Sequence, residues 1–122
     1  MEVLLVEDNS EVSLITVEYL TELGHSAVAV PAAESALQRL TERAFDAVLT
    51  DVSLPGMSGI DLAKELVKHY PKLPVVISSG YGSLNSEFGP ARGQPSVFFL
   101  PKPYDMPTLE KTLSEAAAFA SS

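Results

Sequence analysis

The 122-residue sequence has no cysteine, and its 8 lysine and arginine residues are outnumbered by 16 aspartate and glutamate residues. The absence of cysteine excludes disulfide bonds, thiolate nucleophiles and cysteine-ligated zinc sites. The formal net charge of −8 opposes a nucleic-acid phosphate backbone, so we expect no nucleic-acid partner. No apolar run approaches the roughly 20 residues that span a bilayer, and no signal-peptide pattern precedes the first strand-like run. These absences predict a cytoplasmic protein without a membrane partner.

The length and composition are those of one globular domain. Hydrophobic residues make up 46% of the chain and charged residues 20%, which provides enough apolar material for a buried core. Independently folding units cluster at roughly 100 to 200 residues, so we expect residues 1–122 to form a single domain.

Short aliphatic runs alternate with segments of helical period, a pattern typical of parallel α/β units. Their nearly continuous apolarity suits strands that are buried on both faces of a sheet. The pattern predicts an α/β fold with a doubly wound parallel sheet, in which ligands bind at the carboxyl ends of the strands. The five runs are Val3–Val6, Ser26–Val30, Ala47–Thr50, Pro74–Ser79 and Val97–Leu100.

Four apolar stripes at helical spacing predict the helices. Ser58 and Asp105 are the predicted N-caps of the third and fourth of these helices, and Gly24 is the predicted left-handed residue after the first. The first stripe consists of Val12, Ile15, Tyr19 and Leu23, and the second of Ala33, Ala36, Leu37 and Leu40. The third consists of Leu62, Ala63, Leu66, Val67 and Tyr70, and the last of Leu109, Leu113, Ala116, Ala117 and Ala120.

One helix is missing from the alternation, between the fourth and fifth predicted strands. Residues 80–96 contain four glycines and two prolines. An interior glycine costs about 1 kcal/mol and a proline about 3 kcal/mol relative to alanine in a helix. We therefore expect a short helix or a loop at this position, and long loops inside compact domains are commonly functional.

Polar side chains stand at the carboxyl ends of four of the five predicted strands. They are Glu7, Asp8, Asp51, Ser78, Ser79 and Lys102. If the first strand lies beside the third, three carboxylates converge, and their mutual repulsion requires a cation. Oxygen ligands without histidine or cysteine favour Mg²⁺. A carboxylate beside Mg²⁺ and a lysine can attack phosphorus, so this set indicates phosphoryl transfer to an aspartate.

These residues together resemble the receiver domain of response regulators, the CheY-like family. The resemblance rests on Glu7-Asp8, the segment 51–59 (Asp-Val-Ser-Leu-Pro-Gly-Met-Ser-Gly), Ser79 and Lys102-Pro103, and it covers essentially the whole chain. Each motif alone has an ordinary explanation as a turn, a helix cap or a surface cation, whereas their order along the strands is specific. The resemblance implies two-component phosphorelay signalling and a flavodoxin-like five-stranded sheet in the order 2-1-3-4-5.

The resemblance also implies how the phosphoryl group is handled. Asp51 would accept it from the phosphohistidine of a sensor histidine kinase or a histidine phosphotransfer protein. Lys102 would pair with Asp51 before transfer and with a phosphoryl oxygen afterwards, and the Lys102–Pro103 peptide bond would be cis. Ser79 would donate its hydroxyl to the new phosphate, which adds about −1.5 to −2 units of charge.

Metal and switch residues follow from the same resemblance. Asp8 and the phosphoacceptor would bind Mg²⁺ together with the backbone carbonyl of Ser53, and Glu7 would hold a metal-bound water. Phe99 and Tyr81 would be switch residues that respond to Ser79. The string from Val76 (Val-Ile-Ser-Ser-Gly-Tyr) is similar to a receiver subfamily with a Phe-Ala-Thr-Gly-Tyr-like motif and no ordered fourth helix. We therefore expect phosphorylation to reduce the mobility of residues 80–96.

Two other functions are compatible with the residues. A small Mg²⁺-dependent phosphatase with an aspartyl nucleophile would use the same acids, but such enzymes place a second acid two residues later, where this chain has Ser53. A degenerate receiver would serve only as a docking module, and the complete set of site residues argues against that role. We expect self-catalysed phosphorylation and dephosphorylation, and not an enzyme with a separate product.

Overall fold

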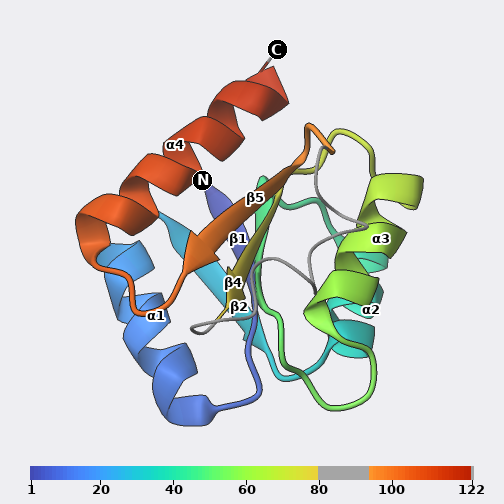
Figure 1. Cartoon of the computed structure of the whole chain (residues 1–122), viewed down its shortest axis with the longest axis horizontal. Helices are drawn as coiled ribbons and strands as arrows, with labels where there is room; N and C mark the ends of the chain where they lie inside the picture. The colour runs from blue at the N-terminus through green and yellow to red at the C-terminus, as the bar shows by residue number, and fades with distance from the viewer. Residues whose placement is uncertain (80–93, 122) are drawn as a thin grey trace.

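The computed structural model describes residues 1–79 and 94–121, which form five strands and four helices (Figure 1). In chain order they are β1 (Glu2–Val6), α1 (Ser10–Glu22), β2 (Ser26–Val30), α2 (Ala33–Glu42), β3 (Ala47–Asp51), α3 (Gly59–His69), β4 (Val75–Ser79), β5 (Val97–Pro101) and α4 (Met106–Ser121). No helix in these residues is both long enough and apolar enough to cross a membrane.

The strands form one parallel sheet in the order β2-β1-β3-β4-β5, which confirms the predicted fold class and strand order. All five predicted strands are present, with bounds that differ from the prediction by one residue at most. The order places β1 beside β3, so the residues after β1 lie next to the end of β3. The condition for the three carboxylates to converge is therefore met.

Two helical layers cover the sheet, and they divide the core in two. Helices α1 and α4 lie on one face, and α2 and α3 lie on the other (Figure 1). Alternate residues along each buried strand serve the two layers, as the period of two requires. In β4, for example, Val75 and Ile77 pack with α2 and α3, whereas Val76 packs with α1 and α4.

The helix starts follow their capping residues. The Ser58 hydroxyl accepts a hydrogen bond from the Asp61 N–H at 3.1 Å, and the Asp105 carboxylate accepts one from the Thr108 N–H at 2.9 Å, so both predicted N-caps are confirmed. The φ angle of Gly24 is +87°, which confirms the predicted left-handed residue after α1.

The predicted apolar stripe on α1 is wrong in part. Ile15 is 51% exposed and its neighbour Leu14 is 66% exposed, whereas Thr16 and Leu20 are the buried residues of this helix. Thr16 can be buried because its hydroxyl donates a hydrogen bond to the Val12 carbonyl at 2.9 Å. Apolar spacing therefore misplaced Ile15, whereas Tyr19 and Leu23 of the predicted stripe do pack against the core.

Strand β5 lies at one edge of the sheet, a position where a proline such as Pro101 is tolerated. The Lys102 N–H donates to the Ser79 carbonyl of β4 at 2.7 Å. Because alternate residues of a strand direct their N–H groups to opposite sides, position 101 directs its missing donor away from β4. Pro101 therefore costs the sheet no hydrogen bond.

Most of residues 80–96, the segment predicted to be a short helix or a loop, lies outside the described residues, and so does Tyr81. The predicted loss of mobility on phosphorylation concerns the same segment. Residues 94–96 are described and lead into β5, and the Val97 N–H donates to the Gln94 carbonyl at 3.1 Å.

Candidate functional site

Three carboxylates meet at the carboxyl ends of β1 and β3. Glu7 and Asp8 follow β1, Asp51 ends β3, and one oxygen from each lies within 4.8 Å of the others. Their burial is graded: Glu7 is buried, Asp51 is half-buried and Asp8 is exposed. The cluster is thus anchored in the protein on one side and open to solvent on the other, as a site for a hard cation with remaining water ligands would be.

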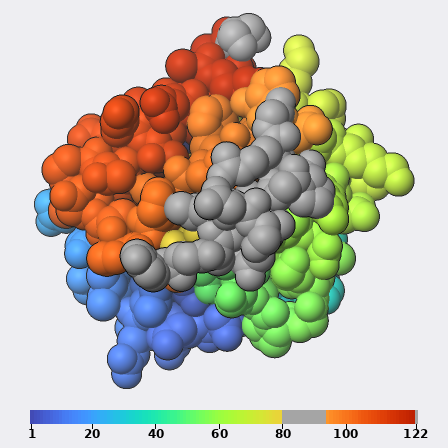
Figure 2. All heavy atoms as spheres, in the orientation of Figure 1, coloured from blue at the N-terminus to red at the C-terminus, as the bar shows by residue number. Residues whose placement is uncertain are grey.

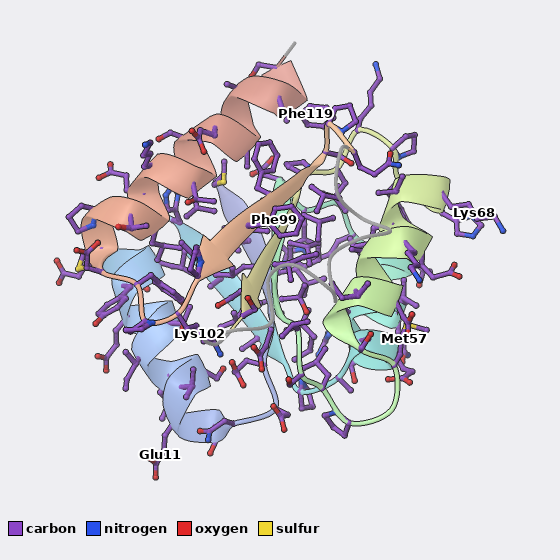
Figure 3. The ribbon with its side chains drawn as sticks, in the orientation of Figure 1. Glu11, Met57, Lys68, Phe99, Lys102 and Phe119 are labelled. Atoms are coloured by element: carbon purple, nitrogen blue, oxygen red, sulfur yellow. The ribbon has the colours of Figure 1, made fainter. Side chains whose placement is uncertain are left out.

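Lys102 faces this cluster from the end of β5, and Figure 3 shows it beyond that strand. Its Nζ lies 3.0 Å from Asp51 Oδ1 and 3.7 Å from Glu7 Oε1. Burial alone would lower the pKa of Lys102, but the hydrogen bond and the charge of Asp51, with the charge of Glu7, raise it above its usual value. Lys102 therefore remains a cation at neutral pH.

Glu7 is the buried acid of the cluster, and its pKa is raised. Burial raises the pKa of Glu7, and the nearby Asp51 carboxylate adds to this, although the Asn9 N–H donates to Glu7 Oε2 at 3.1 Å and opposes the rise. The charges of the described cluster do not balance, because three carboxylates face one ammonium. A divalent cation would relieve the excess, and the donor set of oxygen atoms fits Mg²⁺.

The loop after β3 returns closely to the strand that it leaves. The Gly59 N–H donates to the Val52 carbonyl at 3.0 Å, and a Cβ atom on Gly59 would lie 2.1 Å from the Asp51 carbonyl oxygen. Only glycine permits this approach. Ser53, in the same loop, is exposed and lines a hollow of ≈ 640 Å³ together with Asp8, so the predicted backbone ligand lies on the side of the acids.

Two buried hydroxyls end β4. Ser78 is 3% exposed and Ser79 is 0% exposed, and neither side chain has a hydrogen-bond partner in the described part of the chain. Ser78 is paired with Asp51 across the sheet and faces the α1–α4 layer. Ser79, one residue on, faces the α2–α3 layer, where Phe99 also packs. Register thus places Ser79 and Phe99, the predicted pair of hydroxyl and aromatic switch, on one face.

An apolar groove beside the site was not predicted from the sequence. It has a volume of ≈ 500 Å³, and α1 forms one wall while the residues after β5 form the other. Its lining residues are Val12, Ile15, Thr16, Tyr19, Lys102, Pro103 and Tyr104. The sequence has no local signal for this groove, because the helical spacing of Ile15 predicts a core position, whereas its side chain is exposed.

The peptide bond between Lys102 and Pro103 is cis, as the resemblance implied. Of the predicted site residues, the structure brings together Glu7, Asp8, Asp51 and Lys102. Ser79 ends strand β4, and Ser53 lies in the loop after β3. Tyr81 lies outside the described residues.

Comparison with known proteins gives a consistent result. A family model described as the response regulator receiver domain matches residues 3–114. The response regulator protein FleR of Pseudomonas aeruginosa is 38% identical over 103 residues, which cover 84% of this chain and 22% of FleR. The two-component response regulator PhoP of the same species is 36% identical over 115 residues, which cover 93% of this chain and 50% of PhoP.

Solved structures give the same result for the fold. The receiver domain of NtrX from Brucella abortus matches with a TM-score of 0.86 and 29% identity, covering 95% of this chain and 98% of that one. A response regulator receiver domain protein from Clostridium thermocellum matches with a TM-score of 0.85 and 26% identity, covering 96% and 94%. The chain spans 22% to 50% of the two curated relatives and nearly all of these two structures.

Proposed function

The chain belongs to the family of response regulator receiver domains, and we propose that it acts in two-component phosphorelay signalling, with Asp51 as the residue that accepts the phosphoryl group. The observation that carries this proposal is the position of the Asp51 carboxylate, 3.0 Å from the Lys102 ammonium and beside two further acids. Asp51 ends a buried strand but is itself half-buried, so a donor can reach it from solvent.

The transfer is a single displacement at phosphorus. A carboxylate oxygen of Asp51 forms the new O–P bond while the N–P bond of the donor phosphohistidine breaks, and the electron pair returns to the imidazole nitrogen, which takes up a proton. Lys102 holds Asp51 before the transfer and compensates negative charge on the phosphoryl oxygens during it. Later attack by water on phosphorus releases inorganic phosphate and restores the carboxylate.

Mg²⁺ is the cofactor that these residues fit. The carboxylates of Asp8 and Asp51 and the backbone carbonyl of Ser53 would hold the ion, and the buried Glu7 would hold one of its water ligands. When bound, Mg²⁺ would neutralise charge on the transferring group. Without it, the three carboxylates face one ammonium, that of Lys102, among the described residues.

Ser79 and Phe99 form the proposed link to the rest of the molecule. The Ser79 hydroxyl is fully buried without a partner in the described residues, so a phosphoryl oxygen on Asp51 would offer it a strong acceptor. Movement of Ser79 toward that acceptor would free space on the face of the sheet that Phe99 shares.

The groove beside α1 is the proposed docking surface for the donor, a sensor histidine kinase or a histidine phosphotransfer protein. Glu11, Glu18 and Glu22 lie four residues before and three and seven residues after the exposed Ile15, so they flank it on one side of the helix. We propose that the donor presents an apolar centre with lysine or arginine residues around it. Charge complementarity of this kind sets partner choice and the rate of association.

The same charge argument applies to nucleic acids. The net charge of −8 repels phosphate backbones, so we propose that residues 1–122, as one domain, signal through contacts with protein.

The test of the proposed function is labelling with a small phosphodonor in the presence of Mg²⁺. We expect one phosphoryl group per chain in the wild type, none in Asp51→Asn, and normal labelling in Asp46→Asn, which changes an exposed carboxylate just before β3, at the opposite end of the strands. Continuous release of phosphate far beyond one equivalent would favour the phosphatase. Absence of any label would favour the docking module.

A further inference from the structure

Lys102 takes part in two features of the molecule at once. Its ammonium contacts Asp51, as described above, whereas its side chain also lines the apolar groove with Val12 and Ile15 of α1. A lysine side chain loses considerable rotamer freedom when it is held in one geometry. The backbone that carries Lys102 must therefore be held firmly for the ammonium to stay in place.

Residues 102–104, here called the 102–104 turn, are attached to three different elements. The Lys102 N–H donates to the Ser79 carbonyl of β4 at 2.7 Å. Asp105, the next residue, begins α4 as its N-cap. The Tyr104 hydroxyl lies 3.4 Å from the Thr16 hydroxyl, and this is the hydrogen bond that ties the turn to α1.

The direction of the Tyr104–Thr16 hydrogen bond follows from the other contact of Thr16. The Thr16 hydroxyl has one proton, which it donates to the Val12 carbonyl at 2.9 Å. Tyr104 is therefore the donor, and Thr16 accepts with a lone pair. Burial raises the pKa of Tyr104 above its usual value, so its hydroxyl keeps the proton that this bond requires.

Packing supports the same contact. Thr16 is 4% exposed, and Tyr104 packs against the apolar cluster between the sheet and the α1–α4 layer. The ring thus fixes the turn by apolar contact, and the hydroxyl fixes its position along α1. A phenylalanine at position 104 would keep the first contribution and lose the second.

We propose that Tyr104 is a positioning residue for Lys102: through its hydrogen bond to Thr16, it holds the 102–104 turn against α1 so that the ammonium stays at Asp51. The inference rests on the proposed function of Asp51 and Lys102. It also links the groove to the chemistry, because a donor seated on α1 contacts the same turn that carries Lys102.

The experiment is a double-mutant cycle on the rate of labelling by a small phosphodonor, which needs no docking. Tyr104→Phe should slow labelling about fivefold, the effect expected for loss of one hydrogen bond. In a Lys102→Ala background, Tyr104→Phe should have no further effect. Thr16→Val removes the same bond from α1 and should match Tyr104→Phe, and Thr16→Ser should restore the rate. The control is Tyr70→Phe, the same chemical change on the α2–α3 side of the sheet.

A second measurement does not depend on phosphorylation. The mobility of the Lys102 side chain, followed by NMR relaxation of its methylene and ammonium groups, should increase in Tyr104→Phe and stay unchanged in Tyr70→Phe. Unchanged Lys102 mobility together with wild-type labelling would overturn the inference, and so would equal slowing in the Lys102→Ala background. Failure of the wild type to be labelled on Asp51 would instead overturn the proposed function, and the NMR measurement would still decide the role of Tyr104.

Discussion

The two helical layers of this receiver domain differ in whether their charged side chains form ion pairs with one another. Helices α2 and α3 have four acids and three cations: Glu34, Glu42, Asp61, Glu65, Arg39, Lys64 and Lys68. Ion pairs within these helices join Arg39 to Glu42 at 3.6 Å and Lys64 to Asp61 at 3.9 Å, and His69 Nε2 lies 3.2 Å from Glu65 Oε2. This layer largely neutralises itself.

The α1–α4 layer does the opposite. Its helices have five acids and one cation: Glu11, Glu18, Glu22, Glu110, Glu115 and Lys111. No ion pair within 4.0 Å joins residues of these two helices in the part of the chain that the structure describes. Figure 3 shows Glu11 and Lys68 extending from opposite sides of the molecule, and Figure 2 shows α1 and α4 together on one side.

The exposed apolar side chains follow the same division. In the described residues, the exposed large hydrophobic residues are Leu14 and Ile15, both on α1. A surface that combines unpaired charge of one sign with exposed apolar groups is suited to a partner of opposite charge. The contrast shows that the α2–α3 layer pairs most of its charged side chains within itself, whereas the α1–α4 layer has charged and apolar side chains available for a partner.

The largest effect is expected from a change that disrupts the α2–α3 layer where α3 meets β3. Gly59→Ala would place a Cβ atom 2.1 Å from the Asp51 carbonyl oxygen, and the main chain must move to accept it. We expect a loss of about 3 kcal/mol in the free energy of unfolding, measured by urea denaturation, and weaker Mg²⁺ binding.

Gly24→Ala is the matched control for Gly59→Ala. Gly24 has a φ of +87° but open space around it, so the alanine there meets only backbone strain, about 1 kcal/mol. If the two variants lost equal stability, close contact at Gly59 would not be a special feature of the site.

A smaller effect is expected from charge reversal on the α1–α4 layer. Glu18→Lys should slow phosphotransfer from the cognate donor about threefold at low salt, because it removes attraction for a basic partner. Salt above about 0.5 M should remove most of this difference by screening. The comparison variant is Lys68→Glu on α3, which should leave the transfer rate unchanged; equal slowing in both would contradict a docking surface on α1.

The smallest effect concerns pH, since the layers also differ in their caps. The Thr108 side chain and its N–H lower the pKa of Asp105, the cap of α4, whereas α3 is capped by the hydroxyl of Ser58. A carboxylate with a lowered pKa stabilises the fold above its unfolded pKa, and this contribution disappears as the pH falls through the folded value. In Asp105→Asn, we expect thermal stability to depend less on pH below about 4, while Ser58→Asn leaves that dependence intact.

Much of the fold could be predicted because the three central strands, β1, β3 and β4, are buried and apolar on both faces, and the two edge strands are short aliphatic or aromatic runs. The site could be predicted because each acid and the lysine lie at or just after the carboxyl end of a strand, and the strand order then brings Asp8, Asp51 and Lys102 together. The ends of the strands could be predicted only to within one residue. Glu2 is polar and Pro101 has no N–H, yet they extend β1 and β5 by one residue each.

The α1 surface could not be predicted for a physical reason. An apolar residue that faces a partner has the same periodicity as one that faces the core, so Ile15 was assigned inward. Conversely, Thr16 is polar, and only the intrahelical hydrogen bond to Val12 makes its burial possible. The contact between Thr16 and Tyr104 joins residues 88 positions apart, which no local pattern records.

The proline at the end of β5 bears on how copies of this domain can associate. The backbone groups at alternate positions 97, 99 and 101 of β5 point away from β4. The Val97 N–H donates to the Gln94 carbonyl, and Pro101 has no N–H at all. A strand from another chain would find an interrupted row of donors along this edge. Association at this edge is therefore expected to use side chains, which favours reversible contact over fusion of two sheets into one.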